Sequence, residues 1–334
     1  MIAPSHYKLA LCRPDAPNVF DAQGRVRDGV LDHNVGLYCD LIEQAADRFG
    51  AKLIVFPQFG LTGYTALDSP AWEGASLAFP GPELERIGKA ARRAGAYVVL
   101  SASEKHAAFP NRYFISAGIL TPLGELGLTY RKNYSISMRL SPIDVYSRFV
   151  EVFGHDAFTP VLPTPLGTLG VVIGAEPHYP EITRALALKG AEVILNPIAA
   201  PVIDYMMRPG ADHVRAVRAF ENVAYFAAVN GVQSDIPSKA WDFEGRAIAA
   251  PSDDPRFTLV SVDIEALRKT RSSPAANLLA QIQPQIAEYP HKLPLWPTDA
   301  FAQAAPGSVD ALLAVEEQVW KGLQDIGRGK APGN

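Results

Sequence analysis

The chain has 334 residues, 48% of them hydrophobic, so it can bury a large core as one big domain or two ordinary ones. Its 31 basic and 35 acidic residues leave a formal net charge of −4, which argues against nucleic acid or an anionic membrane as a partner. Two cysteines, Cys12 and Cys39, are too few for a disulfide framework, and no apolar run approaches the roughly 18–20 residues of a bilayer span, so the sequence favours the cytoplasm and no membrane segment.

Short apolar runs alternate with helical patterns along the first hundred residues, which indicates an α/β fold. Strands are predicted at 8–12, 53–56 and 97–100, and helices at 34–49 and 83–94. In the first helix the apolar residues recur on one face with helical spacing, and Gly50 is predicted to end it.

The middle of the chain is rich in β-strand patterns. Residues 114–120 and 126–130, joined by the turn 121–124, predict a hairpin. Further strands are predicted at 169–173, 192–195, 225–229 and 258–262, and helices at 180–189 and 213–223. No internal repeat and no linker divides this region, so residues 1–285 are predicted to form one domain.

From Pro290 onward the composition changes, which predicts that residues 286–334 form an extended arm leading into a helix. Ser308 is the predicted N-cap. The helix has an apolar stripe of Val309, Leu312, Leu313, Val319, Trp320 and Leu323. Such a stripe needs a surface to cover, either on its own domain or on a partner subunit.

Three segments in order resemble the nitrilase superfamily, the carbon–nitrogen hydrolases. They are Leu53-Ile-Val-Phe-Pro-Gln-Phe-Gly-Leu-Thr-Gly-Tyr64, Gly127-Leu-Thr-Tyr-Arg-Lys132 and Leu169-Gly-Val-Val-Ile-Gly-Ala-Glu-Pro-His-Tyr-Pro-Glu181. Each string alone is weak, but their order and spacing together are specific. The resemblance implies a four-layer α-β-β-α sandwich and a homodimer or higher homo-oligomer.

The resemblance also implies a site in which a cysteine attacks an amide or nitrile carbon, a glutamate acts as base, and a lysine and a second glutamate support them. The nucleophile position here is Gly174, the base position is Gln58, and the second glutamate aligns with Ser137. Lys132 is the one group of the four that clearly remains. Conventional thiol hydrolysis is therefore predicted to be absent.

Lys132 is predicted to share a cavity with Tyr134, Glu176 and His178, which form a candidate acid–base set. Two purely structural roles compete with that prediction. Glu176 can form hydrogen bonds with the turn that follows it, and His178 can form hydrogen bonds with the backbone. Gly174 and Ala175 are small, so we expect a roomier pocket base. The other histidines are scattered without metal-ligand spacing, and no glycine-rich nucleotide loop occurs, so neither metal nor cofactor is predicted.

Three functions remain open at this point. The first is a catalytically silent protein that binds a small carbonyl or amide ligand. The second is an enzyme with redirected chemistry, in which Lys132 acts with Glu176 or His178. The third is an amidase-like carbon–nitrogen hydrolase, which rests on family resemblance alone.

Overall fold

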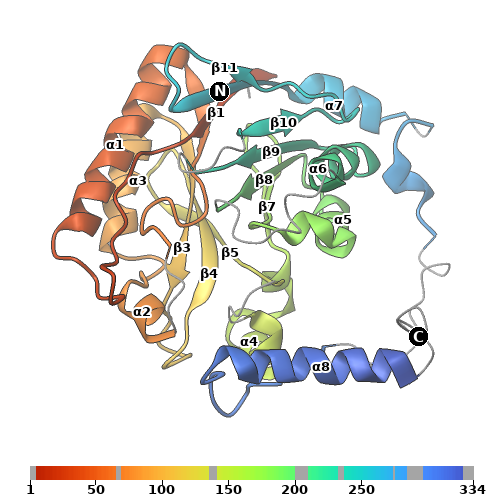
Figure 1. Ribbon diagram of the computed structural model, residues 1–334. Coiled ribbons are helices and arrows are strands. Elements are labelled where there is room, and N and C mark those ends of the chain that lie inside the picture. Colours follow the sequence, from red (N-terminus) through yellow and green to blue (C-terminus); the bar gives the residue numbers. More distant parts are fainter. Residues whose placement is uncertain are drawn as a thin grey trace.

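The computed structural model describes residues 5–64, 69–134, 141–199, 210–231, 237–273, 275–283 and 296–325. Two mixed β-sheets face each other at its centre, and helices cover the outer face of each sheet (Figure 1). This arrangement confirms the predicted four-layer α-β-β-α sandwich.

Within the described residues, the first sheet contains seven strands. Their order across the sheet is β11 (Ala250–Pro251), β12 (Phe257–Asp263), β1 (His6–Cys12), β2 (Ala51–Val55), β3 (Tyr97–Glu104), β4 (Phe114–Leu120) and β5 (Leu126–Arg131). β1, β2 and β3 run parallel, whereas β12, β4 and β5 pair with their neighbours antiparallel. The predicted hairpin is thus confirmed as β4 and β5.

The second sheet has five strands in the part of the chain that is described. Their order is β10 (Lys239–Trp241), β9 (Tyr225–Val229), β8 (Val193–Pro197), β7 (Leu169–Val171) and β6 (Val161–Leu162). β7, β8 and β9 are parallel, with a short antiparallel strand on each edge.

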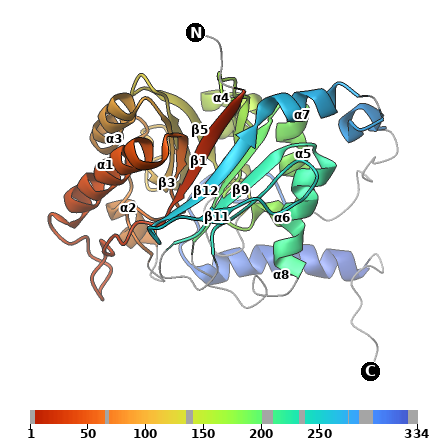
Figure 2. The same ribbon diagram turned by 90° about the horizontal axis from the view of Figure 1, so that it is seen from above.

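The helices separate into two outer layers. α1 (Val30–Phe49) and α3 (Pro82–Ala94) pack on the first sheet, and α5 (Pro180–Leu188) and α6 (Gly210–Glu221) pack on the second (Figure 2). The other elements are α2 (Ser69–Gly74), α4 (Tyr146–Phe153), α7 (Ile264–Arg271), α8 (Val309–Asp325) and the 3₁₀ helices Pro142–Val145, His155–Phe158, Glu176–His178 and Leu278–Gln281. None of the described helices is both long and apolar enough to cross a bilayer.

Strand β1 illustrates why the central strands have near-continuous apolar sequences. Successive side chains of a strand point to opposite faces, so Leu9 and Leu11 enter the core between the sheets, whereas Ala10 and Cys12 pack under α1. Leu9 lies opposite Leu53 on β2 and Val260 on β12. Both faces of the sheet are therefore buried by different layers.

Helix α1 ends as predicted but begins four residues earlier than predicted. Gly50 adopts a left-handed conformation with φ 68°, and its N–H donates to the carbonyls of Ala45 and Ala46. At the other end Gly29 caps the helix without any side-chain hydrogen bond. The helix therefore has no Ser, Thr, Asp or Asn N-cap from which its first residue could be predicted.

Residues 296–302 of the C-terminal arm dock on the segment that precedes and opens α4. Trp296 donates from Nε1 to the Asp144 carboxylate at 2.9 Å. The carboxylate of Asp299 accepts from the N–H and hydroxyl of Ser147, at 2.9 and 2.6 Å. In α8 the predicted Ser308 cap accepts from the N–H of Ala311, yet half of the Leu313 surface is exposed.

Candidate functional site

Three strands end around one point, where the residues that follow them face one another. Gln58 follows β2, Lys132 follows β5 and Gly174 follows β7. An ideal Cβ on Gly174 would lie 2.7 Å from Oε1 of Gln58 and 3.1 Å from Nζ of Lys132. Gln58 and Lys132 are only 7% and 8% exposed. The structure thus places three of the four family positions together, whereas Ser137 lies outside the described residues.

The backbone at Gly174 is held in a left-handed conformation, with φ +61°. Its N–H donates to the Pro197 carbonyl at 2.8 Å, and its own carbonyl accepts from Nδ2 of Asn196 at 3.2 Å. We expected the small residue Gly174 to leave extra space at the base of the pocket. That expectation is wrong, because the ends of Gln58 and Lys132 occupy the space that a side chain at 174 would need.

Substituting Gly174 tests both the backbone conformation and this crowding. Gly95 has φ +58° and nothing within 4 Å of its ideal Cβ, so Gly95→Ala is a matched control for backbone strain alone. We expect Gly95→Ala to lower the free energy of unfolding by about 1–2 kcal/mol, and Gly174→Ala by about 1 kcal/mol more. Urea denaturation of both variants measures the difference, and equal losses would contradict the crowding.

Glu176 is fully buried and ties two loops together. Its Oε1 accepts from the N–H groups of Asn133 and Tyr134, at 2.6 and 3.1 Å, and its Oε2 accepts from the N–H of Ile173 at 2.6 Å. Burial raises the pKa of Glu176, while the Lys132 ammonium and the N–H donors oppose that rise. These bonds join the loop after β5 to the loop after β7, so the carboxylate holds the site together.

His178 lies on the same loop and is bound to the backbone. Its Nδ1 lies 2.8 Å from the carbonyl oxygen of Ala175, a residue that is itself 3% exposed. Burial lowers the pKa of His178, and the charges of Arg215 and Arg218 lower it further. The imidazole is therefore neutral at pH 7.

Tyr134, which we predicted to border the cavity, is 38% exposed. Its ring stacks on that of Tyr179 with a centroid separation of 4.1 Å and an interplanar angle of 5°. The pair joins the loop after β5 to the start of α5 at the surface.

Asn196, which was not among the predicted site residues, supports the site from β8. Its Nδ2 donates to the carbonyls of Val172 and Gly174, and its Oδ1 accepts from Nε of Arg215 at 3.0 Å. Arg218, also from α6, donates to the Pro177 carbonyl at 2.8 Å. A polar residue inside the apolar strand β8 was the available signal, because buried polar groups need a specific reason.

Both cysteines of the chain lie away from Gly174. Cys12 is fully buried between the first sheet and its helices, and burial raises the pKa of its thiol. Cys39 packs against the same layer, where its Sγ donates to the Arg86 carbonyl at 3.7 Å, and burial raises its pKa as well. Both thiols therefore belong to the layer formed by the first sheet and its helices.

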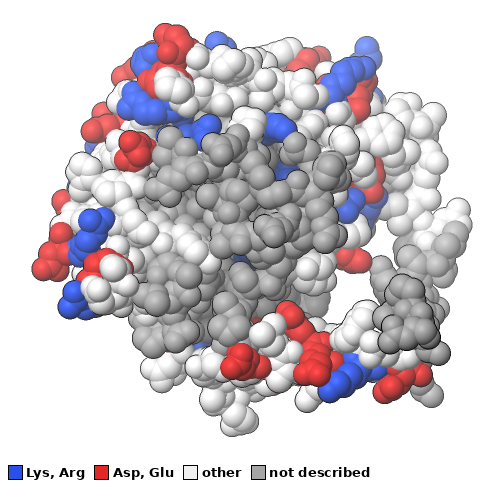
Figure 3. Space-filling model, in the orientation of Figure 1, with Lys and Arg blue, Asp and Glu red and all other residues white. Residues whose placement is uncertain are grey.

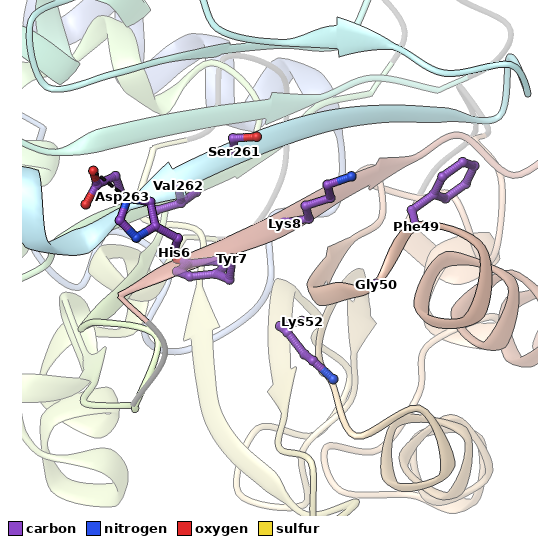
Figure 4. A pocket seen from close by; sticks show the side chains of 9 residues that line it. All are labelled: His6, Tyr7, Lys8, Phe49, Gly50, Lys52, Ser261, Val262 and Asp263. Carbon is purple, nitrogen blue, oxygen red and sulfur yellow. Dashed lines mark ion pairs between the residues drawn. The ribbon is translucent and has the colours of Figure 1, made fainter. Parts of the chain in front are cut away.

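An open depression of about 510 Å³ lies elsewhere, at the start of β1 and the end of α1 (Figure 4). Lys8 and Lys52 both line it but extend away from each other, and His6 is paired with Asp263. It lacks the convergent polar groups of a binding site. Among the described residues, no three His, Cys, Asp or Glu side chains gather in a way that would hold a metal ion.

The carbon-nitrogen hydrolase family model matches residues 22–272. The chain belongs to the carbon-nitrogen hydrolase family. Two relatives of this carbon-nitrogen hydrolase family member come from Pseudomonas. "Hydrolase in pqqF 5'region" of Pseudomonas protegens is 30% identical over 230 residues, which cover 68% of this chain and 73% of the relative. An "(R)-stereoselective amidase" of Pseudomonas sp is 28% identical over 260 residues, which cover 73% of this chain and 84% of the amidase.

Among solved structures, Nit3 of Saccharomyces cerevisiae, a member of branch 10 of the nitrilase superfamily, superposes on this family member with a TM-score of 0.63. The identity is 17%, and the match covers 81% of this chain and 95% of that one. The likeness supports the fold.

Proposed function

We propose that this chain binds a small carbonyl or amide compound at the position of the family's active site and does not hydrolyse it through a thiol. The observation that carries the proposal is Gly174, which lies beside Gln58 and Lys132 where the resemblance places a cysteine. The missing thiol removes the attacking atom, and an amide at position 58 cannot take up its proton.

The remaining groups are suited to holding a carbonyl oxygen. Lys132 presents an ammonium group with three donors, and Gln58 presents an amide with both donors and an acceptor. Both groups are nearly buried, where charge-assisted hydrogen bonds are stronger than in water. Such a site can orient and polarise a carbonyl, but it offers no thiol to attack the carbon.

The proposal is tested with acetamide, propionamide and benzamide, together with nitrile and carbamoyl compounds. We expect binding in ligand-observed NMR but no product above the uncatalysed rate. Lys132→Met should abolish binding, whereas Lys8→Met, in the separate open depression, should leave it unchanged. Product formation that disappears in Lys132→Met would contradict the proposal and favour retained hydrolysis.

A second candidate function uses Lys132 as a nucleophile. It is favoured by His178, whose Nδ1 is bound to the Ala175 carbonyl, which leaves Nε2 as the basic nitrogen of a neutral imidazole. Glu176 is less suited to move protons, because three N–H groups occupy its oxygens.

In this reaction the Lys132 ammonium first gives up a proton, and its amine attacks an aldehyde or keto carbon. The hydroxyl of the resulting carbinolamine takes up a proton and leaves as water, so that an iminium forms. Borohydride then delivers hydride to the iminium carbon and yields a stable secondary amine. Intact-protein mass spectrometry after incubation with aldehydes and keto acids should reveal an adduct that is absent from Lys132→Ala. An unmodified protein would count against this second candidate.

We also infer a cytoplasmic homodimer that needs no cofactor. Both cysteines are free, as a reducing compartment favours. Large apolar side chains are exposed on the outer helix layer, with Leu188, Val217 and Phe220 being 58%, 47% and 53% exposed. Sedimentation equilibrium tests the dimer, which has twice the 36.1 kDa mass of the chain.

A further inference from the structure

We propose that Arg215 is a positioning residue of the ligand site, which acts through Asn196 on the peptide bond between Gly174 and Ala175. The three parts of this relay come from different elements: Arg215 from α6, Asn196 from β8, and the peptide from the loop after β7. The inference rests on the proposed function and goes beyond it, because it names the groups that orient the backbone of the site.

The side-chain amide of Asn196 fits its surroundings in one orientation. Its Oδ1 accepts from Nε of Arg215 at 3.0 Å, and its Nδ2 donates to the carbonyls of Val172 and Gly174 at 3.1 and 3.2 Å. A guanidinium only donates and a carbonyl only accepts, so a half-turn of the amide would set donor against donor and acceptor against acceptor. Arg215 therefore determines that the donor end of Asn196 faces Gly174.

Both side chains of the Arg215–Asn196 contact are buried, with exposed fractions of 7% and 0%. Figure 3 shows other basic side chains at the surface, mixed with acidic ones around the rim of that face. A guanidinium inside the protein needs polar partners, and a hydrogen bond from a charged donor is stronger than one between neutral groups. The contact can therefore hold the amide of Asn196 in a fixed orientation.

The place of Asn196 on β8 shows toward which layer the Gly174 carbonyl points. Side chains alternate along a strand, and Ile194, two positions earlier, packs under the helices of the second sheet. Asn196 thus faces the helix layer too, where α6 covers the sheet (Figure 2). Gln58 and Lys132 follow strands of the first sheet, so they reach Gly174 from the space between the two sheets.

The carbonyl and the N–H of a planar trans peptide point in opposite directions. Because Asn196 holds the Gly174 carbonyl toward the helix layer, the N–H of Ala175 points toward the space between the sheets, where Gln58 and Lys132 lie. Among the described residues, this N–H donates to no acceptor. A reversed peptide would present the Gly174 carbonyl to the ligand instead, and two carbonyl oxygens repel each other.

The test compares Asn196→Asp with Asn222→Asp in the full-length protein. Asp keeps the size of Asn and the contact with Arg215, which keeps it ionised, but it sets an oxygen in place of the donor that holds the Gly174 carbonyl. Asn222 is the matched control, because it is also fully buried and its Nδ2 donates to a backbone carbonyl, that of Arg218, at 2.9 Å. Arg215→Met is the second variant, which leaves Asn196 in place and removes the donor that orients it.

The first measurement does not depend on a ligand. Labelling glycine with ¹³C at the carbonyl and alanine with ¹⁵N selects the Gly–Ala peptides in a carbonyl-filtered NMR spectrum, and Gly174–Ala175 is one of them. We expect the signal of this peptide to move in Asn196→Asp and in Arg215→Met, and to stay in place in Asn222→Asp.

The second measurement is the affinity for acetamide, propionamide and benzamide by ligand-observed NMR. We expect binding to weaken about tenfold in Asn196→Asp, as the loss of one good hydrogen bond predicts, and by a smaller factor in Arg215→Met. Asn222→Asp should bind within about twofold of the unchanged protein. Thermal melts show whether each variant is folded, and Arg215→Met decides the test if Asn196→Asp does not fold.

The outcomes separate this inference from the proposed function. An unmoved Gly174–Ala175 signal would overturn the relay and leave the proposed function standing. A moved signal with unchanged affinity would do the same, because the peptide would then not contact the ligand. Equal weakening in Asn196→Asp and Asn222→Asp would reveal a general loss of stability and would also overturn the relay. If the unchanged protein binds none of the three amides, the proposed function fails and the assignment of Arg215 to a ligand site fails with it.

Discussion

Glu176→Ala should lower the free energy of unfolding by roughly 3–5 kcal/mol, because each buried N–H group left without an acceptor costs about 1–3 kcal/mol and entering water restores part of the loss. Three N–H groups lose their acceptor, from Asn133, Tyr134 and Ile173. Such a loss is a large part of the stability of an ordinary domain. The loops after β5 and β7 should separate first.

Urea denaturation measures the loss, and Glu265→Ala is the control, since Glu265 is an exposed glutamate in the first turn of α7. We expect the control to change stability by no more than about 0.5 kcal/mol. Hydrogen exchange at Ile173 and Tyr134 should rise in Glu176→Ala. If Glu176→Ala were as stable as the control, the Glu176 carboxylate would not be what holds the two loops together.

The second large effect is expected at the buried ion pair beneath the site. Arg131, directly before Lys132, donates from Nη2 to Glu104 at 2.6 Å, and the side chains are 6% and 0% exposed. Ser116 donates its hydroxyl to the other oxygen of Glu104 at 2.5 Å. Removing one partner leaves an uncompensated buried charge, so Glu104→Leu or Arg131→Met should each cost about 3–5 kcal/mol.

A double-mutant cycle measures this pair. Because the double variant buries no lone charge, its loss should be smaller than the sum of the two single losses. The Arg148–Glu151 pair, with a 2.7 Å contact and side chains 49% and 68% exposed, provides the control, and its coupling should stay below about 1 kcal/mol. Additive losses at Glu104 and Arg131 would contradict the buried pair.

The regular core of the fold was predictable because its elements carry strong apolar periodicity. The strands at residues 8–12 and 97–100 and the helix around Val35 all have apolar residues at the spacing of the element they form. β6 and β11 were not predicted, since two residues are too few to show any period. Such short edge strands form because a neighbouring strand offers free backbone groups.

Part of the site was predictable for a related reason. Gln58, Lys132 and Gly174 each follow a strand, and the resemblance fixed their order. The orientation of the side chains could not be predicted: the sequence does not show that the Gln58 amide points into the space beside Gly174. Nor does it show that Glu176 accepts hydrogen bonds from Asn133, a residue 43 positions away.

The docked arm has a consequence for where this chain can be shortened. Residues 296–302 satisfy the buried carboxylate of Asp144 and also accept a hydrogen bond from Arg112, through the Phe301 carbonyl. The predicted domain ends at residue 285, yet a truncation there would leave Asp144 without its indole donor and Arg112 without this carbonyl acceptor. Asp144 belongs to the 3₁₀ turn whose cap, Ser141, donates to the Asn133 carbonyl. The tail is thereby connected to the residue that follows Lys132, so a shortened protein would report on a disturbed site and not on an isolated domain.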